Sequence, residues 1–106
     1  MQAFQLHDLE NKAAEHRNPY FEFLRVPAMS LGLYRLGVGK SDTQFPHKQD
    51  EIYYVLSGKA KLDVNGKRET AVPGTILYIE ASAPHKFINI EEDLEVLVLF
   101  APAEEN

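Results

Sequence analysis

Residues 50–74, DEIYYVLSGKAKLDVNGKRETAVPG, decide the fold. The runs 51–57 and 59–64 are rich in β-branched and aromatic side chains, which suit a pleated, half-buried strand. Asn65-Gly66 follows the second run, and both residues tolerate positive φ, so the pair predicts a two-residue hairpin turn. Pro73-Gly74 predicts a second turn. The stretch therefore indicates consecutive antiparallel strands.

Strand-like runs continue on both sides of this stretch, at the short, regular spacing of a sandwich or barrel. The predicted strands cover residues 20–26, 29–36, 51–57, 59–64, 68–72, 76–80, 85–90 and 95–100. Residues 6–14 predict one short helix, with Asp8 as its cap. We expect a single all-β domain over residues 1–106, a β-barrel or jelly roll, because such closure removes the exposed edges of so many strands.

Length and composition limit the classes of function. A chain of 106 residues has room for one domain with one hydrophobic core. The absence of cysteine excludes disulfides, thiolate zinc sites and thiol nucleophiles, so a transition metal would need His, Glu, Asp or water as ligands. The net charge is −5 and no basic cluster occurs, so we expect no nucleic-acid partner.

Membrane insertion and secretion are not expected either. The longest apolar run, residues 96–101, is far shorter than the roughly 20 residues that span a bilayer. Residues 1–10 lack the basic start and apolar stretch of a signal peptide. A cytoplasmic location is the resulting expectation.

Two of the four histidines lie where they could meet a carboxylate. His85 opens a predicted strand, and His47 comes shortly before Glu51. On one straight strand, the Cα atoms of His47 and Glu51 would stand about 13 Å apart. Both side chains can therefore reach one site only if residues 48–50 form a corner between strands. Taken alone, each histidine is more often a structural hydrogen-bonding residue than a ligand.

The spacing around His47 resembles the first motif of the cupin superfamily, G-x5-H-x-H-x3/4-E-x6-G. Gly39, His47, Glu51 and Gly58 match this pattern. Phe45 stands at the position of the first histidine, and its side chain has no lone pair to donate. The run 50–58 is also typical of small single-domain cupins.

The second cupin motif, G-x5-P-x-G-x2-H-x3-N, is similar to residues 74–89. Gly74, His85 and Asn89 match at the right spacing, while Glu80 and Ser82 stand in the proline and glycine positions. The span from the start of the first motif to the end of the second, residues 39–89, is about half of the chain, and the strand pattern extends the resemblance to nearly all of it.

The resemblance implies a pocket in which His47, Glu51 and His85 hold a divalent metal. Strand alternation adds to this expectation. If Glu51 points into the barrel, Tyr53 shares its face, and His85 shares its face with Phe87 and Asn89. Tyr53 is thus a candidate catalytic phenol, able to donate a hydrogen bond or a proton. The alternative for Tyr53 is a core aromatic whose hydroxyl reaches the barrel mouth.

Three functions stay open, because this fold hosts many activities. The first is a dioxygenase, isomerase or lyase that uses Fe, Mn, Ni or Zn on a small organic molecule. The second is a non-catalytic module that binds a small molecule, with or without metal. The third is a metal-free isomerase or epimerase, with His47 or His85 paired with Glu51 as base and orienting group.

The resemblance also implies a homodimer, as is common among small cupins. Apolar strands such as residues 20–26 and 96–100 would otherwise expose sheet edges on a small barrel.

Overall fold

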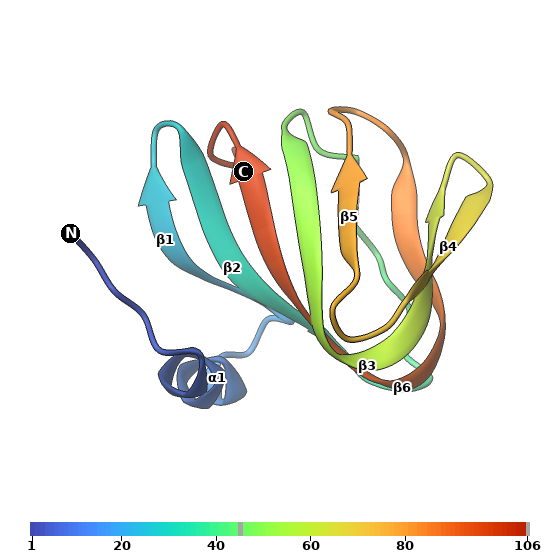
Figure 1. Ribbon diagram of the computed structural model, residues 1–106, viewed down its shortest axis with the longest axis horizontal. Coiled ribbons are helices and arrows are strands. Elements are labelled where there is room, and N and C mark those ends of the chain that lie inside the picture. The colour runs from blue at the N-terminus through green and yellow to red at the C-terminus, as the bar shows by residue number, and fades with distance from the viewer. Residues whose placement is uncertain (45, 106) are drawn as a thin grey trace.

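The computed structural model describes residues 1–44 and 46–105, which form one helix and one antiparallel sheet (Figure 1). The elements in chain order are α1 (Leu6–Glu15), β1 (Tyr20–Val26), β2 (Met29–Leu36), β3 (Asp50–Val64), β4 (Lys67–Ala71), β5 (Ile76–Ile79) and β6 (His85–Ala101). The strand order is β1-β2-β6-β3-β4; β4 pairs with residues 60–64 of β3, and β5 pairs with residues 51–54 of the same strand. The sheet folds over itself as an all-β jelly roll, although hydrogen bonds among the described residues do not close it into a full barrel.

The two longest strands, β3 and β6, give the sheet its curvature. Three register shifts interrupt their pairing between Val55 and Lys61, and such irregularities bend strands. Gly58 lies in this part with a φ of 94°, and a Cβ there would stand 2.2 Å from the carbonyl oxygen of Asp93. Only glycine permits this close approach. Both strands curve here through the base of the fold, so the sheet is U-shaped in Figure 1.

The described residues form six strands, whereas the sequence predicts eight. The predicted interruptions at residue 58 and at residues 91–94 lie within β3 and β6, which continue through them. Glycine and the acidic residues mark the bend of a continuing strand here, not its end.

The inner face of the U forms the main core. The predicted alternation along β3 is confirmed, since Glu51, Tyr53 and Val55 are buried while Ile52 and Tyr54 are exposed. The buried side chains of this core are Tyr34, Leu36, Tyr53, Val55, Ala60, Leu62, Ala71, Ile79, Ala83, Phe87, Leu94, Val96, Val98 and Phe100.

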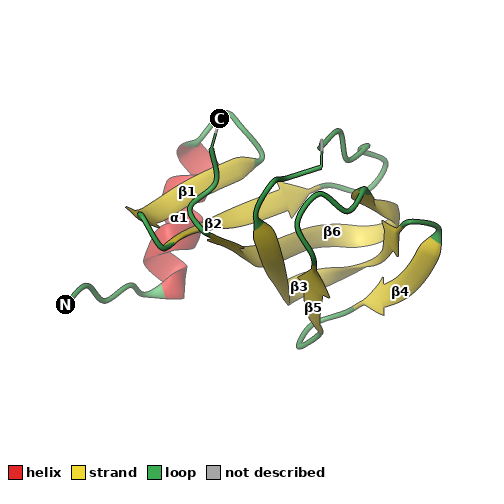
Figure 2. Ribbon diagram, turned by 90° about the horizontal axis from the view of Figure 1, so that it is seen from above, coloured by secondary structure: helices red, strands yellow, loops and turns green. Residues whose placement is uncertain are grey.

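Helix α1 packs outside the U, beside β1 and β2 (Figure 2). Leu9 and Ala13 face Leu33 of β2 in a second, smaller core. Asp8 is not the helix cap: the cap position is Gln5, whose side chain makes no capping bond. Asp8 lies in the first turn, where a carboxylate interacts favourably with the helix dipole. No helix among the described residues is long and apolar enough to cross a membrane.

The predicted turn is present in the structure, but only one of the two expected edge strands lies at an edge. The predicted hairpin turn is confirmed, because Asn65 and Gly66 have φ values of 52° and 86° between β3 and β4. Strand β1 is an edge strand, as expected for residues 20–26. The same expectation is wrong for residues 96–100, which lie in β6 between β2 and β3.

Candidate metal-binding site

Glu51 and His85 meet across the bend of the sheet. Glu51 is the second residue of β3, while His85 begins β6 and pairs with Val64 near the other end of β3. On a straight strand, Glu51 and Val64 would lie about 40 Å apart. The bend brings the two arms of the U face to face, and Oε1 of Glu51 lies 2.9 Å from Nε2 of His85.

His47 joins this pair from the loop that precedes β3. Residues 48–49 form a bend, so the predicted corner is present, although Asp50 already belongs to β3. Ser82 N–H donates to the carbonyl oxygen of His47 at 2.6 Å, which ties this loop to the segment leading into His85. Potential ligand atoms of His47, Glu51 and His85 all lie within 4.8 Å of one another.

Three buried polar atoms of this cluster have no hydrogen-bond partner among the described residues. Among the described residues, neither carboxylate oxygen of Glu51 nor Nε2 of His85 makes a hydrogen bond of acceptable geometry, so the 2.9 Å contact is a close approach without alignment. Leaving a buried carboxylate unpaired is costly. A cation bound between these atoms would satisfy all three of them, so this donor set fits a divalent metal.

The ring of His85 is oriented for such a role. Its Nδ1 lies 2.9 Å from the carbonyl oxygen of Ala83, which can only accept, so Nδ1 carries the proton. The lone pair of a neutral imidazole is then on Nε2, facing Glu51. A backbone carbonyl that fixes the tautomer in this way is a common feature of metal-bound histidines.

Electrostatics at His85 also favour a cation at Nε2. Burial lowers the pKa of His85, but the Glu51 carboxylate and the Ala83 carbonyl raise it by more, so the pKa lies above its ordinary value. The site therefore attracts positive charge, which either a proton or a metal ion can supply.

A glutamate beyond the last strand contacts His47. Oε2 of Glu104 lies 2.6 Å from Nδ1 of His47. The backbone N–H of Glu104 donates to the buried Ser30 hydroxyl at 3.0 Å, which anchors this segment on β2. The sequence gives no signal for this contact, because Glu104 lies in no periodic element.

Asp42 organises the other side of the site, and the sequence did not single it out. It accepts hydrogen bonds from the Tyr34 hydroxyl at 2.6 Å and from the Phe87 N–H at 2.9 Å. It also accepts from the backbone and side-chain N–H groups of Gln44, at 3.3 and 2.9 Å. This buried carboxylate therefore links β2, β6 and the loop that carries Gln44.

The family follows from the sequence match. The Cupin domain family, Cupin_2, matches residues 32–101. The chain belongs to the cupin family. This cupin is 45% identical over 104 residues to Uncharacterized protein SCO3923 of Streptomyces coelicolor, covering 98% of this chain and 99% of that protein.

Two solved structures share the fold of this cupin over nearly its full length. A protein of unknown function from Rhizobium leguminosarum bv. viciae 3841 superposes with a TM-score of 0.79 at 22% identity, covering 96% of this chain and 97% of the other. TT1209 from Thermus thermophilus superposes with a TM-score of 0.76 at 24% identity, covering 97% of this chain and 99% of the other. Both likenesses support the jelly-roll fold.

Tyr53 lies beside the site of this cupin, fully buried. Its hydroxyl oxygen is 3.1 Å from Nε2 of Gln44, which donates to it. Burial raises the pKa of the Tyr53 phenol well above its ordinary value, and the Glu51 carboxylate adds to the rise. The phenol therefore stays protonated, so Tyr53 can donate a hydrogen bond but does not act as a phenolate base.

One residue expected on the inner face lies elsewhere. His85 and Phe87 are buried as predicted, but Asn89 is exposed. Its φ of 50° is a left-handed conformation that breaks the strand alternation. Phe45, the expected ligand position occupied by phenylalanine, lies outside the described residues.

A cavity of about 160 Å³ adjoins the metal-ligand candidates. It is lined by Tyr20, Tyr34, Gln44, His47, Glu51, Val98, Phe100 and Glu104. The lining combines the polar side chains of Gln44, His47, Glu51 and Glu104 with aromatic and aliphatic ones. Pockets for drug-sized ligands typically measure roughly 300–1,000 Å³. This cavity is smaller, so it suits a molecule below that size.

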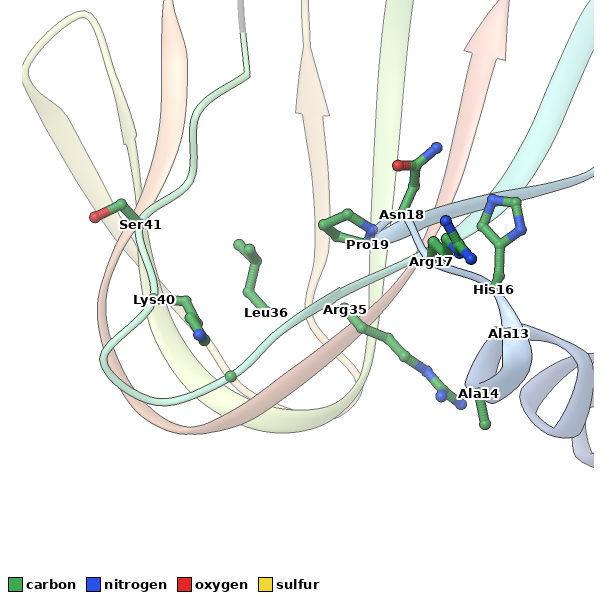
Figure 3. A pocket seen from close by; sticks show the side chains of 11 residues that line it. Ala13, Ala14, His16, Arg17, Asn18, Pro19, Arg35, Leu36, Lys40 and Ser41 are labelled. Atoms are coloured by element: carbon green, nitrogen blue, oxygen red, sulfur yellow. The ribbon is translucent and has the colours of Figure 1, made fainter.

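A larger cavity, about 500 Å³, lies between α1 and the end of β2 and is lined by none of the three candidate ligands (Figure 3). Arg35 reaches toward the end of α1 there, but Glu95 holds it at 2.7 Å and the Glu10 carbonyl accepts from it at 3.2 Å. This surface groove therefore does not share the unpaired buried groups of the smaller cavity.

Proposed function

We propose that this cupin binds one divalent transition metal through His47, Glu51 and His85, and binds or converts a small organic molecule in the adjoining cavity. The observation that carries the proposal is the set of buried, unpaired atoms on Glu51 and His85, which converge with a ring nitrogen of His47. Two imidazoles and one carboxylate suit Fe, Mn, Ni or Zn and leave coordination positions open.

A metal in this site would supply a Lewis acid for a substrate oxygen or a binding place for O₂, as in dioxygenases, isomerases and lyases. The side chains of the protein shape the cavity around the metal. Val98 and Phe100 give the cavity an apolar wall. The protonated Tyr53 hydroxyl keeps the Gln44 amide in place, and the centre of the Tyr53 ring lies 6.0 Å from that of the His85 ring.

The test is elemental analysis of protein purified without a histidine tag or added metal, followed by reloading with single metals. We expect about one transition-metal ion per chain after reloading, held against dialysis. A protein that binds no transition metal under any of these conditions would refute the proposal. Binding of candidate small molecules is then compared between the metal-loaded and the chelator-treated protein.

A metal-free isomerase or epimerase is the second candidate. The close Glu51–His85 pair favours it, since a carboxylate can orient an imidazole that accepts and returns a proton. Turnover that survives full removal of metal by a chelator would select this function over the first. Ligand binding without turnover in either form would identify a non-catalytic binding module.

A further inference from the structure

We infer that Gln44 is a fourth protein ligand of the metal, through its amide oxygen Oε1. The inference rests on the proposed function. It adds a residue at a position where the first motif specifies no residue type. It matters because Phe45, next to Gln44, stands where the first motif has a histidine. A ligand at position 44 would replace the donor that the sequence lacks at position 45.

The orientation of the Gln44 amide is fixed by its neighbour Asp42. Nε2 of Gln44 lies 2.9 Å from Oδ2 of Asp42 and 3.1 Å from the Tyr53 hydroxyl oxygen. A carboxylate only accepts hydrogen bonds, so the NH₂ group must face Asp42. The amide oxygen therefore faces away from Asp42: it lies 3.1 Å from Nε2 of His47 and accepts a longer hydrogen bond, 3.4 Å, from the Tyr53 hydroxyl.

His47 cannot satisfy both of its neighbours as a neutral ring. A neutral imidazole has one N–H, and two acceptors lie next to its two nitrogens: Glu104 at Nδ1 and Gln44 at Nε2. The carboxylate of Glu104 is charged and closer, at 2.6 Å, so Nδ1 carries the proton. In this tautomer Nε2 directs a lone pair toward the oxygen of Gln44, an arrangement that a metal ion bound to both atoms would make favourable.

The distances agree with two neighbouring ligands of one ion. Ligands with bonds of about 2.1 Å at right angles to each other lie about 3.0 Å apart. The Gln44–His47 separation is 3.1 Å and the Glu51–His85 separation is 2.9 Å. Gln44, His47 and Glu51 line the same cavity.

The support behind Gln44 also suits a ligand. Asp42, which holds the amide, is itself fixed by the Tyr34 hydroxyl and the Phe87 N–H. A donor held in place by buried partners loses little freedom when it binds a metal, so it adds affinity. Gln44 thus has the oriented, supported donor atom that a ligand needs.

The test uses Co²⁺ as the probe and compares Gln44→Leu and Gln44→His with wild type. We expect Gln44→Leu to weaken Co²⁺ binding about tenfold in competition with a chelator. Gln44→His should change the visible ligand-field spectrum of bound Co²⁺, because an imidazole would replace an amide oxygen in the coordination sphere. Gln49→Leu and Gln49→His are matched controls: Gln49 is a buried glutamine of the same loop that does not line this cavity, and both controls should resemble wild type.

A second measurement needs no variant at position 44. In ¹⁵N-labelled wild-type protein, Zn²⁺ should shift the side-chain NH₂ signals of Gln44 far more than those of Gln49. Unchanged Gln44 signals, or Gln44 variants with wild-type affinity and spectrum, would overturn the inference while leaving the three-residue site intact. A wild-type protein that binds neither Co²⁺ nor Zn²⁺ would instead refute the proposed function itself.

Discussion

Glu51 and His85 lie 2.9 Å apart at the site, although His85 pairs along the sheet with Val64 and not with Glu51. The contact is therefore made across the U and not along a strand ladder. It depends on the bend at Gly58, which folds β3 and β6 back far enough for Glu51 and His85 to face each other. The cluster of candidate ligands therefore forms only because the sheet bends at Gly58.

Removal of either imidazole should remove the metal. His47→Ala and His85→Ala each delete one of three proposed ligands, so each variant should lose most of its bound metal while its circular dichroism stays that of a β protein. Elemental analysis after dialysis measures the loss. His7→Ala is the control, because His7 is exposed on α1. Stoichiometric metal in both site variants would exclude these two residues as ligands.

Glu104→Gln should weaken metal binding without abolishing it. The Glu104 carboxylate accepts from Nδ1–H of His47 and makes the other nitrogen a better donor, and loss of such a partner typically costs 10- to 100-fold in affinity. We expect about tenfold, measured by chelator competition. Glu105→Gln changes an exposed neighbouring carboxylate and should have no effect. Equal affinities in the two variants would rule out this role for Glu104.

The stability of the metal-free protein should fall as the pH rises, whereas that of the metal-loaded protein should rise. The pKa of His85 is raised in the folded protein, so its protonated form stabilises the fold at a pH below the ordinary histidine value. That contribution is lost as the pH increases through the raised pKa. Metal needs the deprotonated ring, so its stabilisation has the opposite sign of pH dependence.

Thermal melts between about pH 5.5 and pH 8, with metal or with chelator, measure both slopes over the range in which histidine titrates. In chelator, His85→Gln should flatten the slope. Melting temperatures that depend on pH in the same direction with and without metal would contradict this linkage.

Gly58→Ala should destabilise the protein far more than Gly74→Ala. Both glycines have positive φ, 94° and 92°, so both substitutions share the backbone strain, about 1–3 kcal/mol. Only at Gly58 would the new methyl group meet the Asp93 carbonyl oxygen, whereas nothing lies within 4 Å at Gly74. Denaturant unfolding measures the difference, which we expect to exceed about 1 kcal/mol. Equal losses would mean that the bend tolerates a side chain.

We predict a homodimer at micromolar concentration, and the outer face of β3 and β5 is the surface to test. Ile52 pairs with Tyr78 and Tyr54 with Ile76 on this face, and all four side chains are exposed. Adjacent exposed hydrophobic residues of this kind favour association. Light scattering should give a dimer for wild type and for the control Val38→Glu, but a monomer for Ile76→Glu. A wild-type monomer would refute the prediction.

The strands and their inward faces could be predicted from the sequence, because a period of two residues assigns each side chain to a face. Glu51 and Tyr53 are buried for this reason. The continuity of β3 could not be predicted. A glycine within an apolar run is equally typical of a strand end and of a bend, and only the close approach of Asp93 to Gly58 distinguishes them.

Some residues of the candidate site could be predicted from the sequence and others could not. The motif spacing pointed to His47, Glu51 and His85, and the fold brings them together. Asp42, Gln44 and Glu104 could not be found, because they lie in segments outside strands, where no periodicity indicates the direction of a side chain. The contacts of Asp42 with Phe87 and of Glu104 with His47 join residues that are distant in the sequence.

The bend also limits how the length of the chain can change. Glu51 faces inward only because the number of residues between it and the bend at Gly58 keeps its phase in the alternation. Deleting or inserting one residue in that arm would turn the carboxylate to the outer surface, and changing two would restore the phase but slide it about 7 Å along the strand. Loss of this site therefore requires no change in any of its own side chains, since a single-residue length change in β3 is enough.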